Sequence, residues 1–71
     1  METVKPGVYR HFKGNLYRVL FSARHSETGE EMVVYRAHYG EQDYWVRPAA
    51  MWQEAVERNG YSGPRFTWVE P

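Results

Sequence analysis

The stretch GVYRHFKGNLYRVL, residues 7–20, decides how the start of this chain folds. Residues 8–12 alternate between two faces, with Tyr9 and His11 on one of them, and a period of two is typical of a β-strand. Residues 13–15, Lys-Gly-Asn, interrupt the alternation, and glycine and asparagine are the residues that most readily take a positive φ. The stretch therefore predicts two antiparallel strands joined by a tight hairpin turn.

The second strand of the hairpin is followed by three further predicted strands. The hairpin strand, residues 16–23, has an apolar face that is expected to point into the core and comprises Tyr17, Val19, Phe21 and Ala23. After a polar turn at 24–31, residues 32–39 read as a third strand, which is rich in β-branched and aromatic residues. One of its faces comprises Val33, Tyr35, Ala37 and Tyr39, and the other comprises Met32, Val34, Arg36 and His38. Residues 44–47 and 65–69 complete the predicted strands.

Pro48 marks the start of the one predicted helix, over residues 48–58, because proline is well placed in a first helical turn. The Asn59-Gly60 pair is interpreted as the stop signal of that helix. One stripe of the helix is apolar and is expected to pack on the core: Met51, Trp52, Ala55 and Val56.

The 71 residues allow one domain, 1–71, which must be stabilised without disulfides because the chain has no cysteine. Its three Trp, six Tyr and three Phe are expected to supply the core, since aromatic side chains bury large areas. The predicted fold class is mainly β with one α-helix. We expect a small SH3-like, partly open β-barrel of four to five strands, with the helix closing one end.

Charge is balanced over the whole chain but not along it. The formal net charge is zero, which argues against binding to nucleic acid by bulk charge alone. Between Thr3 and Ser26, however, there are five cations and no acid: Lys5, Arg10, Lys13, Arg18 and Arg24. No targeting segment and no apolar run of about 20 residues is visible, so a cytoplasmic protein without membrane contact is expected.

The order of these segments resembles the bacterial family described as domain of unknown function 1653. The resemblance covers nearly the whole chain and is carried by Gly7, Tyr9, Arg10, His11, Lys13, Gly14, His25, Glu27, Thr28, Val34, Tyr35, Trp45, Arg47, Pro48, Pro64, Arg65 and Phe66. The resemblance implies a small β-rich bacterial protein. It implies no activity, so no catalytic residue is transferred from it.

Catalysis and metal binding have little support in the residues. There is no thiol nucleophile, and His25 with Glu27 across a polar turn is the one candidate acid–base pair. The three histidines stand in separate segments without the short spacing of metal ligands. We therefore predict no catalytic residue, no metal site and no cofactor, and a small hydrolase-like enzyme is the third alternative for function.

A binding module is the predicted function. Arginine forks grip phosphate or carboxylate, and aromatic rings stack on bases, so the expected ligand is anionic: a nucleotide or a nucleic acid. The predicted ligand-binding residues are Tyr9, Arg10, His11, Lys13, Arg24, His25, Tyr35, Arg36, Trp45, Arg47 and Arg65. The alternative is a protein–protein interaction or assembly module, present as a monomer or a weak homodimer. The competing structural interpretation is that these cations pair with nearby acids and the tyrosines fill the core.

Overall fold

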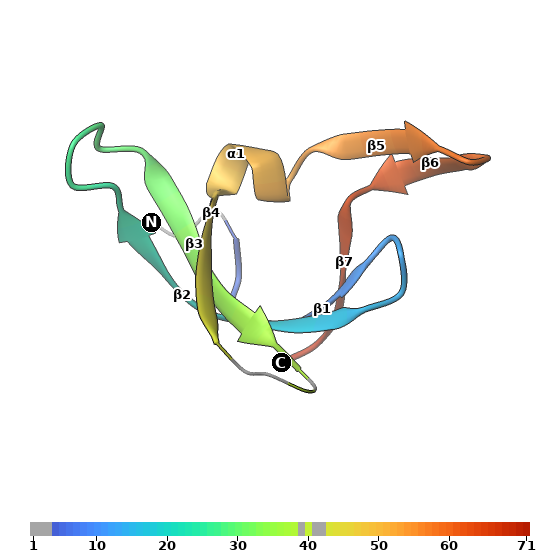
Figure 1. Ribbon diagram of the computed structural model, residues 1–71, viewed down its shortest axis with the longest axis horizontal. Coiled ribbons are helices and arrows are strands. Elements are labelled where there is room, and N and C mark those ends of the chain that lie inside the picture. Colours follow the sequence, from blue (N-terminus) through green and yellow to red (C-terminus); the bar gives the residue numbers. More distant parts are fainter. Residues whose placement is uncertain (1–3, 39, 41–42) are drawn as a thin grey trace.

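The computed structural model describes residues 4–38, 40 and 43–71 of the chain, and Figure 1 shows their arrangement. The elements, in chain order, are β1 (Gly7–His11), β2 (Leu16–Arg24), β3 (Glu31–Ala37), β4 (Tyr44–Pro48), α1 (Ala49–Trp52), β5 (Ala55–Arg58), β6 (Tyr61–Pro64) and β7 (Phe66–Glu70). The prediction of a mainly β chain with one helix is confirmed, with a larger number of strands and a shorter helix than expected.

Five strands form an antiparallel sheet in the order β4-β3-β2-β1-β7, and β5 pairs with β6 in a second, two-stranded sheet. The larger sheet curves strongly, and α1 lies across its open side (Figure 1). In the described part of the chain β4 and β7 remain edges, so the sheet does not close into a barrel. The curvature gives the sheet a concave face, on which the core lies, and an outer face.

The predicted first hairpin is confirmed. Gly7 pairs with Val19 and Arg10 with Leu16, so β1 and β2 form an antiparallel pair with an unbroken register. At the turn, the backbone N–H of Gly14 donates to the carbonyl of His11 at 2.7 Å. This turn holds residues 12–15 next to the end of β1.

The predicted core face of the second strand is correct only for its first half. Tyr17 and Val19 face the core, whereas Phe21 is 51% exposed and Ala23 is also exposed. The reason is a shift of register between Val19 and Phe21 in the pairing of β2 with β3. Because a β-bulge sets two residues against one, the alternation of faces is reversed beyond it.

The predicted helix over 48–58 is wrong beyond Trp52. After α1 the chain enters a hairpin in which Val56 pairs with Gly63. Its turn is Asn59-Gly60, with φ of 50° and 82°. Two successive positive φ angles are the requirement of a tight type I′ hairpin turn, for which Asn-Gly is the strongest short signal. The dipeptide therefore turns a hairpin here and does not end a helix.

Aromatic rings dominate the core. Trp52 of α1 stacks on Phe66 of β7, with ring centroids 3.7 Å apart and planes at 2°. Tyr9 and Tyr35 set their edges against the same indole, at 5.5 and 5.0 Å. Edge-to-face and stacked pairs of this kind stabilise a core beyond the area that they bury. The core thus joins α1 to three strands that are distant in sequence.

Candidate functional site

Four of the predicted binding residues lie together. His11 ends β1, Lys13 lies in the turn that follows, Arg47 is in β4, and Arg65 immediately precedes β7. Lys13, Arg47 and Arg65 are all close enough to His11 to lower its pKa through their charges. Three separate segments, residues 11–13, β4 and the start of β7, therefore bring cationic or hydrogen-bonding side chains to one place.

Arg47 reaches this place from the far edge of the sheet. It pairs with Val33 across β3 and β4, and Val33 is fully buried, so Arg47 lies on the concave face. Its guanidinium carbon lies 5.6 Å from the centroid of the Phe66 ring, which is a cation–π distance. Among the described residues no carboxylate forms an ion pair with Arg47, so its hydrogen-bond donors remain available to a ligand.

Arg65 is held more firmly. One terminal nitrogen of its guanidinium lies 3.0 Å from a carboxylate oxygen of Glu54. Its backbone N–H donates to the Glu54 carbonyl, and its own carbonyl accepts from the Phe12 N–H at 2.9 Å. The side chain is 17% exposed, and its Nε is buried without a hydrogen-bond partner in the described structure. The backbone contacts and the Glu54 carboxylate therefore position Arg65 beside the end of β1.

His11 is oriented by its neighbours. The backbone N–H of Lys13 donates to His11 Nδ1 at 3.1 Å, so the neutral ring carries its proton on Nε2. The ring sits edge-on to Phe66 at 5.0 Å and near Phe12 at 4.5 Å. Burial, followed by the charges of the nearby cations, lowers the pKa of His11 below its ordinary value of 6.5. At neutral pH the ring is therefore a neutral hydrogen-bond donor.

A hollow of about 500 Å³ lies beside these residues, where the β1–β2 turn faces the β5–β6 hairpin (Figure 1). It is lined by Phe12, Lys13, Arg58, Asn59 and Tyr61. The rings of Phe12 and Tyr61 stack at 5.7 Å with an angle of 18°. Lys13 thus belongs both to the surroundings of His11 and to this hollow. We call His11, Lys13, Arg47, Arg58 and Arg65 together the cationic cluster.

Arg58 was missed by the sequence analysis, because residues 48–58 were assigned to a helix. The missed signal was the Asn59-Gly60 dipeptide. As a hairpin turn it makes Arg58 and Tyr61 register partners, and the structure shows that pairing. A cation and an aromatic ring then share one end of the hairpin.

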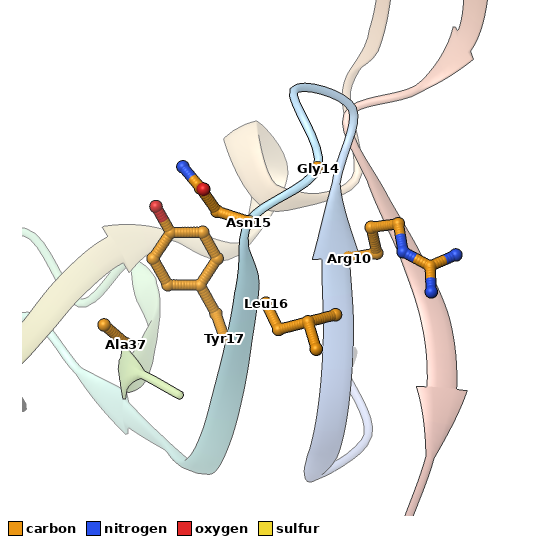
Figure 2. Close-up of a pocket in the computed structure, with 6 residues that line it drawn as sticks. All are labelled: Arg10, Gly14, Asn15, Leu16, Tyr17 and Ala37. Carbon is orange, nitrogen blue, oxygen red and sulfur yellow. The ribbon is translucent and has the colours of Figure 1, made fainter. Parts of the chain in front are cut away.

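A second hollow, of about 470 Å³, lies at the first hairpin and is lined by Arg10, Gly14, Asn15, Leu16, Tyr17 and Ala37. Figure 2 shows that Arg10 and Tyr17 point to opposite sides of this hairpin. Arg10 is the one cation among the residues that line this hollow, and its guanidinium does not lie against the Tyr17 ring. We do not assign a binding role to this hollow.

Tyr9 and Tyr35 were predicted as stacking surfaces for a ligand, and the structure places both rings in the core, 9% and 8% exposed. The Tyr9 hydroxyl donates to the Lys5 carbonyl at 2.8 Å. Burial raises the pKa of that hydroxyl, partly offset by this hydrogen bond. The accessible rings of the site belong to Phe12 and Tyr61, which were not in the predicted set.

Arg24 ends β2 and His25 begins the turn to β3, away from the β5–β6 hairpin (Figure 1). Arg24 donates to the Gly29 carbonyl at 2.8 Å. His25 Nδ1 accepts the backbone N–H groups of Glu27 and Thr28 at 3.1 and 3.3 Å. Both side chains therefore organise the turn on which they stand, and the structure does not bring them to the cationic cluster.

The remaining predicted residues are spread over the sheet. Arg36 lies on the outer face, opposite Arg18 on one side and Tyr44 on the other. Trp45 pairs with Tyr35 at the β4 edge and is 55% exposed. It shares the concave side of β4 with Arg47, two residues along. Arg36 is therefore separated from the cluster by the sheet, whereas Trp45 lies on its border.

The lowered pKa of His11 predicts a dependence of stability on pH. The folded chain holds the proton less tightly than the unfolded chain, in which the pKa is near 6.5, so protonation favours unfolding. The free energy of unfolding should have its full value above pH 6.5. It should fall between pH 6.5 and the lowered pKa of the folded state, and it should level off below that pKa. Denaturant titrations from pH 8 to pH 5 measure this change.

Two further measurements make that prediction specific to His11. His11→Gln should flatten the change, whereas the same exchange at His25 should leave it in place. The ring-proton shifts of His11 should titrate below pH 6.5 in NMR spectra. Arg47→Gln should move that titration toward 6.5. A His11 that titrates at or above 6.5 would contradict the assigned surroundings.

No metal-ligating group of three or more His, Cys, Asp or Glu gathers in the part of the chain that the structure describes. No described helix is long and apolar enough to span a membrane.

The fold and the site define a small, open, antiparallel β-domain with a cationic cluster at one end. The chain belongs to the family described as protein of unknown function DUF1653, whose model matches residues 7–68. Among solved structures, it is similar to a protein of this family from Bordetella bronchiseptica, seen in a crystal structure. The two are 39% identical with a TM-score of 0.88, over 99% of this chain and 92% of that one. No curated protein matches the chain.

Proposed function

We propose that this chain is a binding module for an anionic ligand, a nucleotide or a nucleic acid, held at the cationic cluster. The observation that supports the proposal is the convergence of residues 11–13 with Arg47 and Arg65: His11 and the Arg47 guanidinium both lie against the Phe66 ring, the residue after Arg65, and the Lys13 N–H donates to His11. Cations placed together in a folded chain repel one another, and an anion between them removes that cost.

The donors of the cluster suit phosphate. Arg47 has no described acidic partner, and neutral His11 keeps a proton on Nε2. Charge-assisted hydrogen bonds from guanidinium groups to phosphate are among the strong ones in proteins. The neighbouring hollow adds Lys13, Arg58 and two rings, which suit a second phosphate or a base.

The experiment is an NMR titration of the protein with ATP and, separately, with a thymidine oligonucleotide of about eight nucleotides, in low salt. Backbone amides of 11–15, 47, 58–61 and 65 should shift, with a dissociation constant below millimolar. Affinity should fall as salt is added, because phosphate binding releases counterions. The absence of shifts at millimolar ligand would overturn the proposal.

Arg47→Gln tests the site itself. Loss of one charge-assisted hydrogen bond to phosphate should weaken binding by about 10- to 100-fold. Arg36→Gln is the matched control, since it removes the same charge from the outer face and should change affinity less than about threefold. Equal losses in both variants would mean that the ligand responds to overall charge, with no site at the cluster.

A further inference from the structure

The β4 edge of the sheet carries an unusual surface. Its successive residues Tyr44, Trp45 and Val46 are 68%, 55% and 61% exposed, although all three are large and apolar. An edge strand leaves every second N–H and carbonyl unpaired, and proteins commonly protect such edges with charges, bulges or a covering segment. β4 carries a single charge, Arg47, before it ends at Pro48.

The exposed surface continues from the edge onto the outer face. Val46 pairs with Val34, and Val34 pairs with Phe21, so the three side chains form one row across three strands. Phe21 is 51% exposed, because the bulge in β2 turns it outward. We call the exposed edge and this row together the β4 patch: Phe21, Val34, Tyr44, Trp45 and Val46, of which Trp45 lies on the concave side of the edge and the other four on the outer face.

We propose that the β4 patch binds a second copy of this chain, with the two β4 strands pairing antiparallel about a two-fold axis at Val46. Val46 then lies opposite Val46 of the second copy. Trp45 of each copy lies opposite Arg47 of the other, so the two-fold axis gives two equivalent Trp45–Arg47 pairs. Tyr44 lies opposite Pro48. The two five-stranded sheets become one sheet of ten strands, and Phe21 and Val34 extend its apolar row across the axis.

The chemistry of β4 favours a second copy over an unrelated strand. An incoming strand must place something other than a cation opposite Arg47, and Trp45 of a second copy does so with a cation–π pair. Parallel pairing in register would set Arg47 against Arg47, which is repulsive. The antiparallel arrangement about Val46 gives every side chain of the strand a compatible partner.

The area predicts a weak dimer. With the exposures given above and roughly 150–250 Å² for each aromatic side chain, the patch offers roughly 500 Å² per copy. Phe21 and Val34 lie on β2 and β3, away from the contact, so the pairing buries at most the exposed parts of Tyr44, Trp45 and Val46, which is less than about 1,000 Å² for two copies and below the usual range of specific interfaces. We therefore expect a dissociation constant in the micromolar range or weaker, visible as a concentration-dependent mass.

Sedimentation equilibrium without added ligand, from about 10 μM to 1 mM, tests the proposal. The mass of the wild-type chain should rise toward twice the monomer. Val46→Lys should abolish the rise, because it places two cations against each other at the axis, while circular dichroism confirms that the exposed variant stays folded. Val69→Lys makes the same exchange on the opposite edge strand and should leave the dimer intact. A wild-type monomer at 1 mM, or a dimer lost only in Val69→Lys, would overturn the proposal.

A disulfide trap tests the register. The chain has no cysteine, so Val46→Cys introduces a single thiol. Cross-strand neighbours lie 4.5–5.5 Å apart at Cα, within the range that a disulfide spans. Under mild oxidation Val46→Cys should give a covalent dimer at least tenfold faster than Val69→Cys. Equal rates would exclude pairing about Val46. Since no anion takes part, failure here leaves the proposed ligand site unaffected.

Discussion

Replacing Gly7 by alanine is expected to destabilise the domain by about 3 kcal/mol or more. A Cβ built at this position would lie 2.4 Å from Cζ3 of Trp68 and 2.7 Å from the carbonyl oxygen of Glu70. The φ of Gly7 is +146°, a conformation that L side chains rarely adopt. Both the clash and the strain would act where β1 lies between β2 and β7. Denaturant unfolding monitored by tryptophan fluorescence measures the loss.

The size of this effect matters because the domain is small. At about 0.05–0.15 kcal/mol per residue, 71 residues give a stability of roughly 4–10 kcal/mol. Gly14→Ala is the matched control, since its φ is +105° but its added Cβ would meet no atom within 4 Å. It should cost about 1 kcal/mol from backbone strain alone. Equal losses in the two variants would show that contact with Trp68 and Glu70 is unimportant.

Local signals in the sequence predicted several elements correctly. The first hairpin follows from an alternating run broken by Lys-Gly-Asn, and Val33 and Tyr35 share one face of β3 as their spacing indicated, which the structure shows to be the core face. The bulge at Val19–Phe21 could not be predicted in this way, because it depends on how β2 fits β3 in the curved sheet. The same pattern of alternating apolar residues is compatible with a straight strand and with a bulged one. Tyr39, the last residue of the predicted third strand, lies outside the described residues.

The helix over 48–58 failed for a different reason. Residues 49–58 contain good helix formers, but the free energy gained by pairing β5 with β6 outweighs a weak propensity. The Asn59-Gly60 dipeptide fits both a helix end and a hairpin turn, and its neighbours did not decide between them.

The convergence of the site residues could not be predicted from the sequence either. The sequence identified His11, Lys13, Arg47 and Arg65 as candidates, together with seven residues that the structure places elsewhere. Their convergence depends on the curvature that brings β4 and the start of β7 to the end of β1. Spacing along the chain carries no information about that curvature. Tyr9 and Tyr35 could not be distinguished from surface rings, because a tyrosine suits either environment.

Trp52→Ala is expected to cost about 3–5 kcal/mol, the usual range for removing a buried aromatic side chain. Trp52 is 2% exposed and contacts Phe66, Tyr9 and Tyr35 through its ring. These contacts join α1 to β1, β3 and β7, so no single strand can move to fill the cavity. A loss of this size is a large part of the roughly 4–10 kcal/mol expected for the domain. Denaturant unfolding followed by circular dichroism, which does not depend on the removed fluorophore, measures it.

Two variants separate the ring from its polar atom and from the helix. Trp52 Nε1 is buried without a hydrogen-bond partner among the described residues, so Trp52→Phe removes an unsatisfied donor while keeping a ring against Phe66. It should cost much less than Trp52→Ala. Met51→Ala, next to it on α1 and 43% exposed, should change stability by less than about 1 kcal/mol. Phe66 also contacts His11 and Arg47, and a phenylalanine ring at position 52 should keep Phe66 in place. Trp52→Phe should therefore leave the pH titration of His11 unchanged. A Trp52→Ala loss no larger than that of Met51→Ala would contradict an aromatic core centred on Trp52.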